Sequence, residues 1–189
     1  MRRMVRVRAL TCGTMCLGIL LASIAGRTQG AAVLAPYVPS PPDVVARMLE
    51  LAAVTSADVV YDLGSGDGRI VIEAARRYSA RGVGIELEPG LVARSVAAAT
   101  AAGVLPLTRF EAGDVFAADV SAATVVTLYL LSASNARLRP FLLAQLAPGT
   151  RIVSHDFAMG DWEPAQVETF TASDGRSHTL YLWHVPTAP

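Results

Sequence analysis

The run from Asp62 to Arg69 (DLGSGDGR) constrains the fold more than any other feature of the chain. The apolar residues 58–61 before it predict a buried strand, and residues 70–77 after it predict a helix. Glycines let the backbone turn tightly and approach a ligand closely, and the start of a helix offers free amide donors. The sequence therefore predicts an α/β sheet with a nucleotide-like ligand at this turn.

The spacing of the glycines narrows the kind of ligand. Gly64, Gly66 and Gly68 form a G-x-G-x-G pattern. The dinucleotide-binding pattern G-x-G-x-x-G needs a glycine at the position that Arg69 occupies. The spacing therefore disfavours a pyrophosphate-binding loop.

Arg69 itself is predicted to need a carboxylate partner. It stands in the first turn of the predicted helix, where a positive charge is unfavourable against the helix dipole. Asp67, Glu86 and Glu73 are the candidate partners. We expect a structural ion pair rather than a substrate contact.

Two further acids stand at the ends of predicted strands. Glu86 ends the predicted strand 82–86, and Asp114 follows the predicted strand 107–111. A carboxylate at a strand end can accept hydrogen bonds from the hydroxyls of a ribose.

Because of these two acids and the glycine run, the chain resembles the class I methyltransferases that use S-adenosyl-L-methionine. The resemblance implies that Glu86 holds the ribose and that Asp114 meets the adenine amine. It also implies that the methionine part is wrapped by Asp62, Gly64, Ser65, Gly66 and Gly68. The other interpretation is a glycine turn in a different doubly wound protein.

The rest of the chain alternates strands with helices. Helices are predicted at about 43–53, 69–79, 90–102 and 134–146. Strands are predicted at 58–62, 82–86, 107–111, 124–130, 151–155, 165–171 and 178–185. Asp174-Gly175 between the last two segments is a hairpin signal. The fold class is therefore α/β. The family resemblance implies a Rossmann-like, mostly parallel seven-stranded sheet in the order 3-2-1-4-5-7-6, with helices on both faces and strand seven antiparallel.

Composition argues against a nucleic-acid partner. The chain has no lysine, and all 16 of its basic residues are arginines. Five arginines precede residue 31, which leaves 11 arginines against all 16 acids in residues 31–189, a net charge of −5. An acidic domain lacks the basic surface of a nucleic-acid binder.

The N-terminal segment predicts export or a membrane anchor. Four arginines and no acid precede the mostly apolar run Leu10–Gly26, which is about as long as a short membrane span. We expect residues 1–30 to be a signal peptide or signal anchor that meets the membrane. Residues 31–42 would then form a proline-rich linker or lid, and residues 43–189 the methyltransferase domain. The protein would be membrane-associated or exported. The cytoplasmic origin of S-adenosylmethionine favours the alternative, a cytoplasmic domain.

The cysteines and histidines predict no metal site. Cys12 and Cys16, the only two cysteines, lie inside the leader. The histidines form neither C-x-x-C-type nor H-E-x-x-H-type patterns. His178 and His184 share a face of the last predicted strand and are interpreted as structural.

Motifs outside the glycine run resemble a narrower family. They are Pro36–Pro41 (PYVPSP), Gly82–Leu87 (GVGIEL), Thr127–Leu131 (TLYLL), Ser154–Phe157 (SHDF) and Gly160–Trp162 (GDW). Over residues 36–186 the chain is similar to the small seven-β-strand lysine methyltransferases of the ATP-synthase c-subunit and adenine-nucleotide-translocase type, and to their bacterial relatives. The resemblance implies transfer of a methyl group to a protein lysine, with a membrane protein as one candidate acceptor. A small-molecule methyltransferase and an exported noncatalytic binding domain are the alternatives.

Four residues are candidates for the chemistry at the transferred methyl. Tyr129, His155 and Asp156 stand where the fourth and fifth strands end, and sites of open α/β sheets lie at such ends. Tyr37 precedes the first helix and is a candidate lid. Lysine must lose its proton before it attacks, so His155 is a candidate proton acceptor and Asp156 a candidate substrate contact.

Overall fold

The computed structural model describes residues 34–187. The predicted leader, residues 1–30, lies outside the described residues. Within residues 34–187, no helix is both long enough and apolar enough to cross a membrane.

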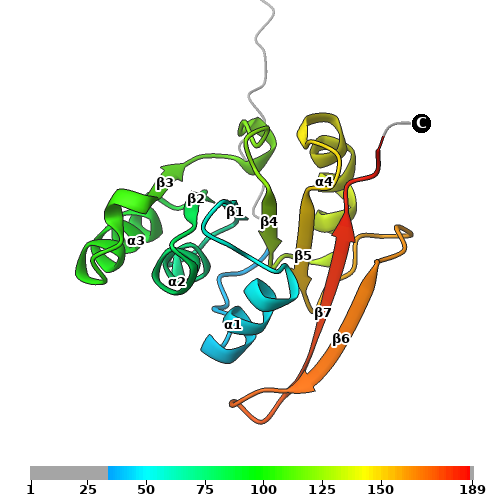
Figure 1. The fold of residues 1–189 in the computed structure, drawn as a ribbon, viewed down its shortest axis with the longest axis horizontal. Helices are drawn as coiled ribbons and strands as arrows, with labels where there is room; N and C mark the ends of the chain where they lie inside the picture. Colours follow the sequence, from blue (N-terminus) through cyan, green and yellow to red (C-terminus); the bar gives the residue numbers. More distant parts are fainter. Residues whose placement is uncertain (1–33, 188–189) are drawn as a thin grey trace, which may run out of the picture. The chain divides into compact units, whose positions relative to one another are not determined.

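A seven-stranded sheet with flanking helices forms the described part of the chain (Figure 1). The helices are α1 (Pro42–Leu51), α2 (Arg69–Tyr78), α3 (Pro89–Ala101) and α4 (Ser132–Gln145), with short 3-10 turns η1 (Leu105–Leu107) and η2 (Val115–Ala117). The strands are β1 (Val59–Leu63), β2 (Arg81–Glu86), β3 (Thr108–Ala112), β4 (Val125–Leu128), β5 (Arg151–His155), β6 (Gln166–Thr171) and β7 (Ser177–His184).

The strand order is β3-β2-β1-β4-β5-β7-β6, which confirms the predicted sheet. β1 to β5 pair in parallel, whereas β7 runs antiparallel to both β5 and β6. Most element boundaries differ from the prediction by one or two residues, and the difference at β4 changes the position of a site residue. β4 was expected to reach residue 130, but its pairing with β1 stops at Leu63↔Leu128. Tyr129 and Leu130 therefore lie in the connection beyond the strand.

Alternate residues of the central strands point to opposite faces of the sheet and pack into two separate hydrophobic cores. In β1, Val60 packs with α1 and α2, whereas Tyr61 and Leu63 pack with the α4 side of the sheet. These side chains are at most 4% exposed. Burying an aliphatic side chain fully contributes about 1.5–3 kcal/mol. The parallel strands are thus covered on both faces, as near-continuous apolar runs require.

The topology gathers the chemistry-bearing residues at one edge of the sheet. Parallel strands end at the same edge, so the connections after β1, β2, β4 and β5 lie close together. The glycine run follows β1, Glu86 ends β2, Tyr129 follows β4 and His155 ends β5. This edge therefore carries the candidate site.

Candidate active site

The loop after β1 depends on left-handed glycines. The φ angles of Gly64, Gly66 and Gly68 are +81°, +55° and +77°. Side chains other than glycine rarely adopt this region, so the G-x-G-x-G spacing sets the course of the turn. The amides of Gly64 and Ser65 both donate to the carbonyl of Ile85, which fixes the loop against β2.

Gly66 lies directly under an aromatic side chain. A Cβ atom built at Gly66 would stand 2.7 Å from the ring of Tyr37. The space above the loop therefore accepts no side chain. Tyr37, from the segment before α1, therefore lies over the turn, and the predicted close approach of a ligand to this backbone stays a prediction.

Glu86 fixes the loop and keeps acceptor capacity. Its Oε2 accepts a hydrogen bond from the Gly66 amide at 2.8 Å, and its Oε1 accepts one from the Glu88 amide at 3.0 Å. A carboxylate has about four lone-pair sites. About two sites therefore stay available for ligand hydroxyls.

Asp62 is a buried carboxyl at the end of β1. It is 3% exposed, and its Oδ1 accepts a hydrogen bond from the Thr127 hydroxyl at 2.8 Å. Burial raises the pKa of Asp62 to about 7, because a charge is poorly solvated there. A cationic ligand group beside Asp62 would favour the ionised carboxylate.

Asp114 and Ser65 complete the predicted cofactor set. Asp114 Oδ1 accepts from the Phe116 amide at 3.0 Å and so begins the η2 turn. The Ser65 hydroxyl is buried and has no hydrogen-bond partner in the described protein. It faces β2, since a Cβ at Gly84 would lie 2.6 Å from it. All the predicted cofactor residues except Gly68 line one crevice.

A segment before α1, residues 34–40, closes one side of this crevice and is here called the lid segment. Arg69 ties it to the glycine loop. The Arg69 guanidinium donates to both carboxylate oxygens of Asp67, at 2.8 and 2.6 Å, and to the carbonyl of Ser40 at 2.7 Å. The hydrogen bonds from Arg69 lower the pKa of Asp67. The predicted structural ion pair is confirmed, with Asp67 as the partner.

Two of the four predicted catalytic residues line the crevice. Tyr37 and Tyr129 do so, whereas His155 and Asp156 do not. His155 is fully buried, and its ring stacks on Tyr129 with centroids 3.8 Å apart. Of the four predicted catalytic residues, the structure therefore brings Tyr37 and Tyr129 to the crevice wall and places His155 against Tyr129. The roles of Tyr37 and Tyr129 stay predictions.

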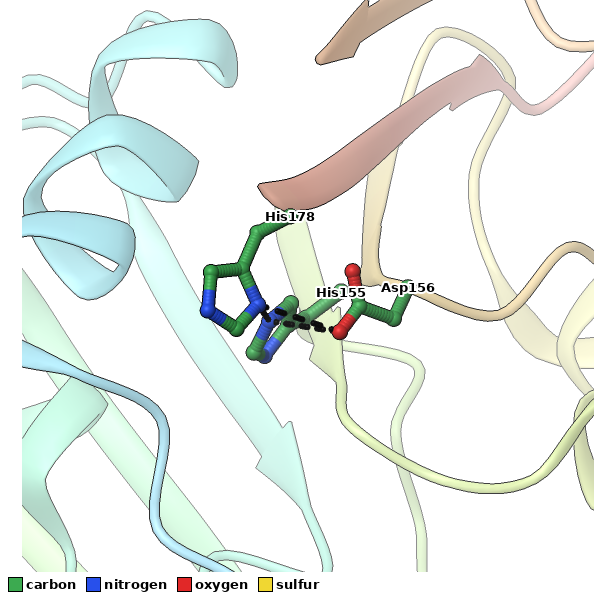
Figure 2. Close-up of side chains that lie close together, drawn as sticks. All are labelled: His155, Asp156 and His178. Carbon is green, nitrogen blue, oxygen red and sulfur yellow. Dashed lines mark hydrogen bonds and ion pairs between the residues drawn. The ribbon is translucent and has the colours of Figure 1, made fainter. Parts of the chain in front are cut away.

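His155, Asp156 and His178 form a compact group, here called the His–Asp cluster (Figure 2). His155 Nε2 and His178 Nδ1 are 2.8 Å apart, and each lies 3.1–3.2 Å from Asp156 Oδ2. Burial lowers the pKa of His155 to about 4. Burial also acts to lower the pKa of His178, but hydrogen bonds to Asp174 and Asp156 outweigh it and raise that pKa.

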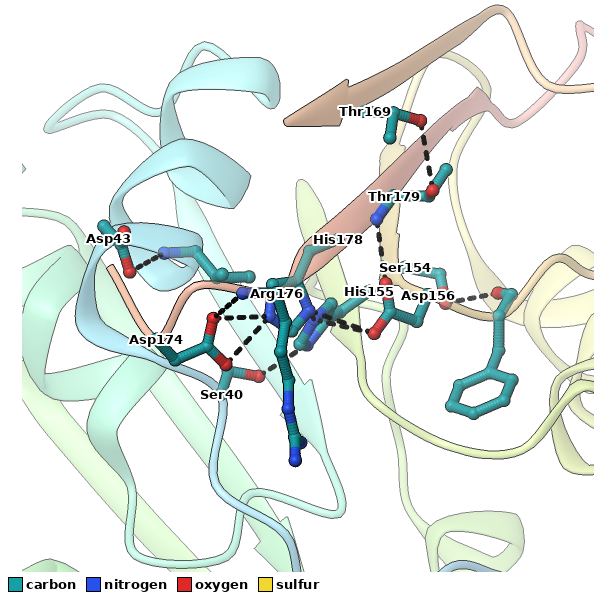
Figure 3. Close-up of polar contacts among 12 residues, drawn as sticks. Ser40, Asp43, Ser154, His155, Asp156, Thr169, Asp174, Arg176, His178 and Thr179 are labelled. Carbon is teal, nitrogen blue, oxygen red and sulfur yellow. Dashed lines mark hydrogen bonds and ion pairs between the residues drawn. The ribbon is translucent and has the colours of Figure 1, made fainter. Parts of the chain in front are cut away.

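Sequence reasoning missed two members of this edge. Ser40 lines the crevice, and its hydroxyl lies 2.9 Å from His155 Nδ1 (Figure 3). His178 was interpreted as structural but joins the His–Asp cluster from β7. Only the even spacing of His178 and His184 hinted at a shared strand face, and the structure separates the two: His178 is buried and His184 exposed.

The residues at the crevice fit S-adenosylmethionine. Gly66 accepts no side chain beneath Tyr37, and the crevice is lined by carboxylates that can accept hydrogen bonds from hydroxyl and amino groups. A glycine loop after β1, an acid ending β2 and the order 3-2-1-4-5-7-6 define a class I methyltransferase that uses S-adenosylmethionine.

Comparison with known proteins agrees with this class. The model of the ANTKMT methyltransferase domain matches residues 62–166, and the chain belongs to that family. It is 44% identical over 150 residues to a protein-lysine N-methyltransferase of Saccharolobus islandicus (strain REY15A), covering 78% of this chain and 92% of that protein. It is 33% identical over 132 residues to the ATP-synthase c-subunit lysine N-methyltransferase of Xenopus laevis, covering 70% of this chain and 58% of that protein. The chain thus spans little more than half of the vertebrate enzyme.

A solved structure resembles the chain over most of its length. It is described as an RNA methyltransferase from Salinibacter ruber in complex with S-adenosyl-L-homocysteine. The sequences are 55% identical, the TM-score is 0.75, and the match covers 80% of this chain and 96% of that one. The bound product of the cofactor agrees with a methyltransferase that uses S-adenosylmethionine.

Proposed function

We propose that the protein transfers a methyl group from S-adenosylmethionine to a lysine side chain of a protein. The charge of the crevice carries the proposal. Six charged residues line it, and five are acids: Asp62, Asp67, Glu86, Glu88 and Asp114. The single cation among these lining residues, Arg69, is already paired with Asp67. Such a crevice attracts a cationic side chain and repels a polyanion.

The residues that would hold the cofactor follow from their positions. Asp62, Ser65 and the glycine loop would take the methionine part. Glu86 would accept from the ribose hydroxyls with its remaining lone pairs, and Asp114 would meet the adenine amine. The sulfonium of the cofactor supplies an already activated methyl group.

The protein's own contribution is to align and desolvate the lysine amine. An ammonium has no lone pair, so the lysine must arrive neutral or lose a proton at the crevice. Tyr129 and Tyr37 are the aromatic residues on the crevice wall, and their ring faces suit a long cationic chain. Holding the amine in line with the methyl group provides the rate enhancement.

RNA is the competing substrate, because the Salinibacter ruber neighbour carries that description. Residues 31–189 have a net charge of −5, counting 11 arginines against 16 acids. RNA binding draws on phosphate contacts from basic groups. The acidic crevice and the 44% identity to a protein-lysine N-methyltransferase favour a protein substrate.

We also propose that residues 1–30 bring the enzyme to a membrane. The support is their arginines, the absence of acids and the apolar run Leu10–Gly26. A membrane-embedded protein would then be the natural acceptor. The name of the Xenopus laevis relative, a lysine N-methyltransferase of the ATP-synthase c-subunit, points the same way.

Labelled cofactor separates the candidate substrates. The full-length chain is incubated with methyl-labelled S-adenosylmethionine and, in parallel, membrane proteins, soluble proteins and total RNA. We expect label in a membrane-protein band, and methyllysine after acid hydrolysis. Gly66→Val serves as the cofactor-binding control. Label confined to RNA, or protein label in a residue other than lysine, overturns the proposal.

A further inference from the structure

We propose that the His–Asp cluster is a binding site for a divalent transition-metal ion, with His155, Asp156 and His178 as ligands. Among the His, Cys, Asp and Glu side chains of residues 34–187, these three form a group whose ligand atoms lie close enough together to hold a metal ion. The site is distinct from the cofactor crevice, because none of the three lines that crevice.

The three ligand atoms face one point (Figure 2). His155 Nε2 and His178 Nδ1 are 2.8 Å apart, and Asp156 Oδ2 lies 3.2 Å and 3.1 Å from them. Imidazole and carboxylate ligands stand roughly 2.0–2.2 Å from a zinc-type ion, and ligands about 3 Å apart then subtend roughly 90–100° at the metal. Two histidines and one carboxylate on one face is a known arrangement for divalent metals.

The three ligand atoms form a triangle, and hydrogen bonds cannot make all three of its edges favourable at once. A ring nitrogen carries at most one hydrogen, and an ionised carboxylate oxygen carries none. If both nitrogens carry hydrogens, those hydrogens face each other across the 2.8 Å edge. If one or none does, two lone pairs face each other across another edge. With Asp156 ionised, every protonation state of the two rings therefore leaves at least one repulsive edge, and a cation at the centre removes it.

The outer atoms of the ligands are held as metal ligands usually are (Figure 3). His178 Nε2 lies 3.2 Å from an Asp174 carboxylate oxygen, and His155 Nδ1 lies 2.9 Å from the Ser40 hydroxyl. Asp156 Oδ1 accepts from the Thr179 amide at 2.8 Å. Such partners orient metal-binding histidines and carboxylates and raise the basicity of the histidines.

The backbone holds Asp156 in place beside the two rings. Asp156 has φ +59°, in the left-handed region, and its amide donates to the Thr179 carbonyl at 2.7 Å. The two histidines are buried, whereas the Asp156 side chain is 28% exposed, so the cluster is reached by solvent on the Asp156 side.

The ion would tie the end of β5 to the start of β7 beside the crevice. His155 stacks on Tyr129, which lines the crevice, so the metal would fix the position of that tyrosine. We therefore expect metal loss to lower kcat and to leave cofactor affinity unchanged.

The test is metal titration of the full-length, untagged chain carrying Cys12→Ser and Cys16→Ser, which removes the only thiols. The chain is stripped with a chelator and titrated with Zn²⁺ or Co²⁺. We expect one equivalent to bind, Co²⁺ to give visible absorption bands, and Tm to rise with metal, because a ligand of the native state stabilises it. A chain that binds no stoichiometric ion overturns the proposal.

Variants locate the ion. His178→Gln should abolish binding, and His184→Gln is the matched control, since His184 is exposed on the same strand. Asp174→Asn removes only the outer partner of His178 and should weaken binding roughly 10–100-fold. If His178→Gln does not fold, metal binding by Asp174→Asn tests the site instead. Unchanged binding in His178→Gln, or in Asp174→Asn, overturns the site.

Discussion

The cofactor crevice and the His–Asp cluster lie at the same edge of the sheet but are encoded differently. Most of the predicted cofactor residues that line the crevice come from the run Asp62–Arg69 together with Glu86, the residue that ends the next strand. The cluster joins the end of β5 to residue 178, and it depends on the register that pairs His155 with Leu180. The difference shows which sites a contiguous motif reveals and which need the sheet first.

The two regions also differ in what their polar groups lack. Crevice carboxylates such as Glu86 and Asp114 already accept backbone hydrogen bonds and keep further capacity for a ligand. In the His–Asp cluster, by contrast, the three ligand atoms contact one another, and at least one of the three contacts between them is repulsive. We therefore expect crevice variants to act on cofactor binding and cluster variants to act on metal binding.

Among single substitutions, the largest loss of cofactor affinity is expected at Gly66. In Gly66→Val a branched side chain must enter space that Tyr37 fills, 2.7 Å from the built Cβ, at a φ of +55°. Cofactor affinity should fall by more than about 100-fold, which corresponds to roughly 3 kcal/mol. Isothermal titration calorimetry with S-adenosylmethionine measures it.

The matched control for Gly66 is Gly103→Val. Gly103 has a similar φ of +71°, but nothing lies within 4 Å of its built Cβ. It should lower stability through backbone strain and leave cofactor affinity unchanged. Equal affinity in Gly66→Val and the parent would mean that the glycine loop does not contact the cofactor.

Glu86→Ala is expected to have the next largest effect. Removing a carboxylate that accepts hydrogen bonds costs about 1.5–3 kcal/mol, roughly 10- to 150-fold in cofactor affinity. From sequence alone, Glu86→Gln should cost less. The structure narrows that difference, because both carboxylate oxygens accept backbone amides and the glutamine NH₂ must face one of them. Affinity measured in both variants and in the exposed Glu111→Gln control decides the role of Glu86.

The fold was predictable because its signals are local. Turn glycines, apolar strand runs and the Asp174-Gly175 hairpin each act over a few residues, and the strand order came from the family resemblance. That these residues would lie at one crevice was predictable for the same reason. The positions of His155 and His178 were not, since they depend on antiparallel pairing across 23 positions and on how Tyr129 leaves β4.

A pH-dependent effect is expected at Asp62. Its pKa is about 7 in the folded chain against an ordinary value of 3.8. Between pH 4 and 7 the folded state therefore keeps a proton on Asp62 that the unfolded state has lost, and this group alone lowers the free energy of unfolding by about 4 kcal/mol as pH rises through that window. His155, whose pKa is lowered to about 4, acts in the opposite direction over the same range, so the effect of Asp62 is the difference between the parent and Asp62→Asn. Urea unfolding of the cofactor-free chain across this pH range measures the fall.

Cofactor binding should show the opposite slope. The positive groups of S-adenosylmethionine favour the ionised Asp62, so affinity should rise up to about tenfold per pH unit below pH 7 and level off above it. Asp62→Asn removes this titrating group, so it should flatten the affinity profile and remove the Asp62 contribution from the stability profile. Glu163→Gln, at an exposed position outside the crevice, should leave both slopes as in the parent. An affinity independent of pH in the parent would place the cationic groups away from Asp62.

The smallest effect is expected at Tyr129, where the two regions touch. Tyr129→Phe keeps the ring that stacks on His155 at 3.8 Å and removes only the hydroxyl at the crevice. Loss of one hydrogen bond costs about 0.5–1.5 kcal/mol, so kcat should fall roughly 2- to 13-fold with cofactor affinity unchanged. Tyr129→Leu removes the stack as well and should lower kcat further. If kcat is equal in the parent and Tyr129→Phe and falls only in Tyr129→Leu, the ring of Tyr129 matters rather than its hydroxyl. The role of Tyr129 would then be to support the His–Asp cluster rather than to act at the crevice.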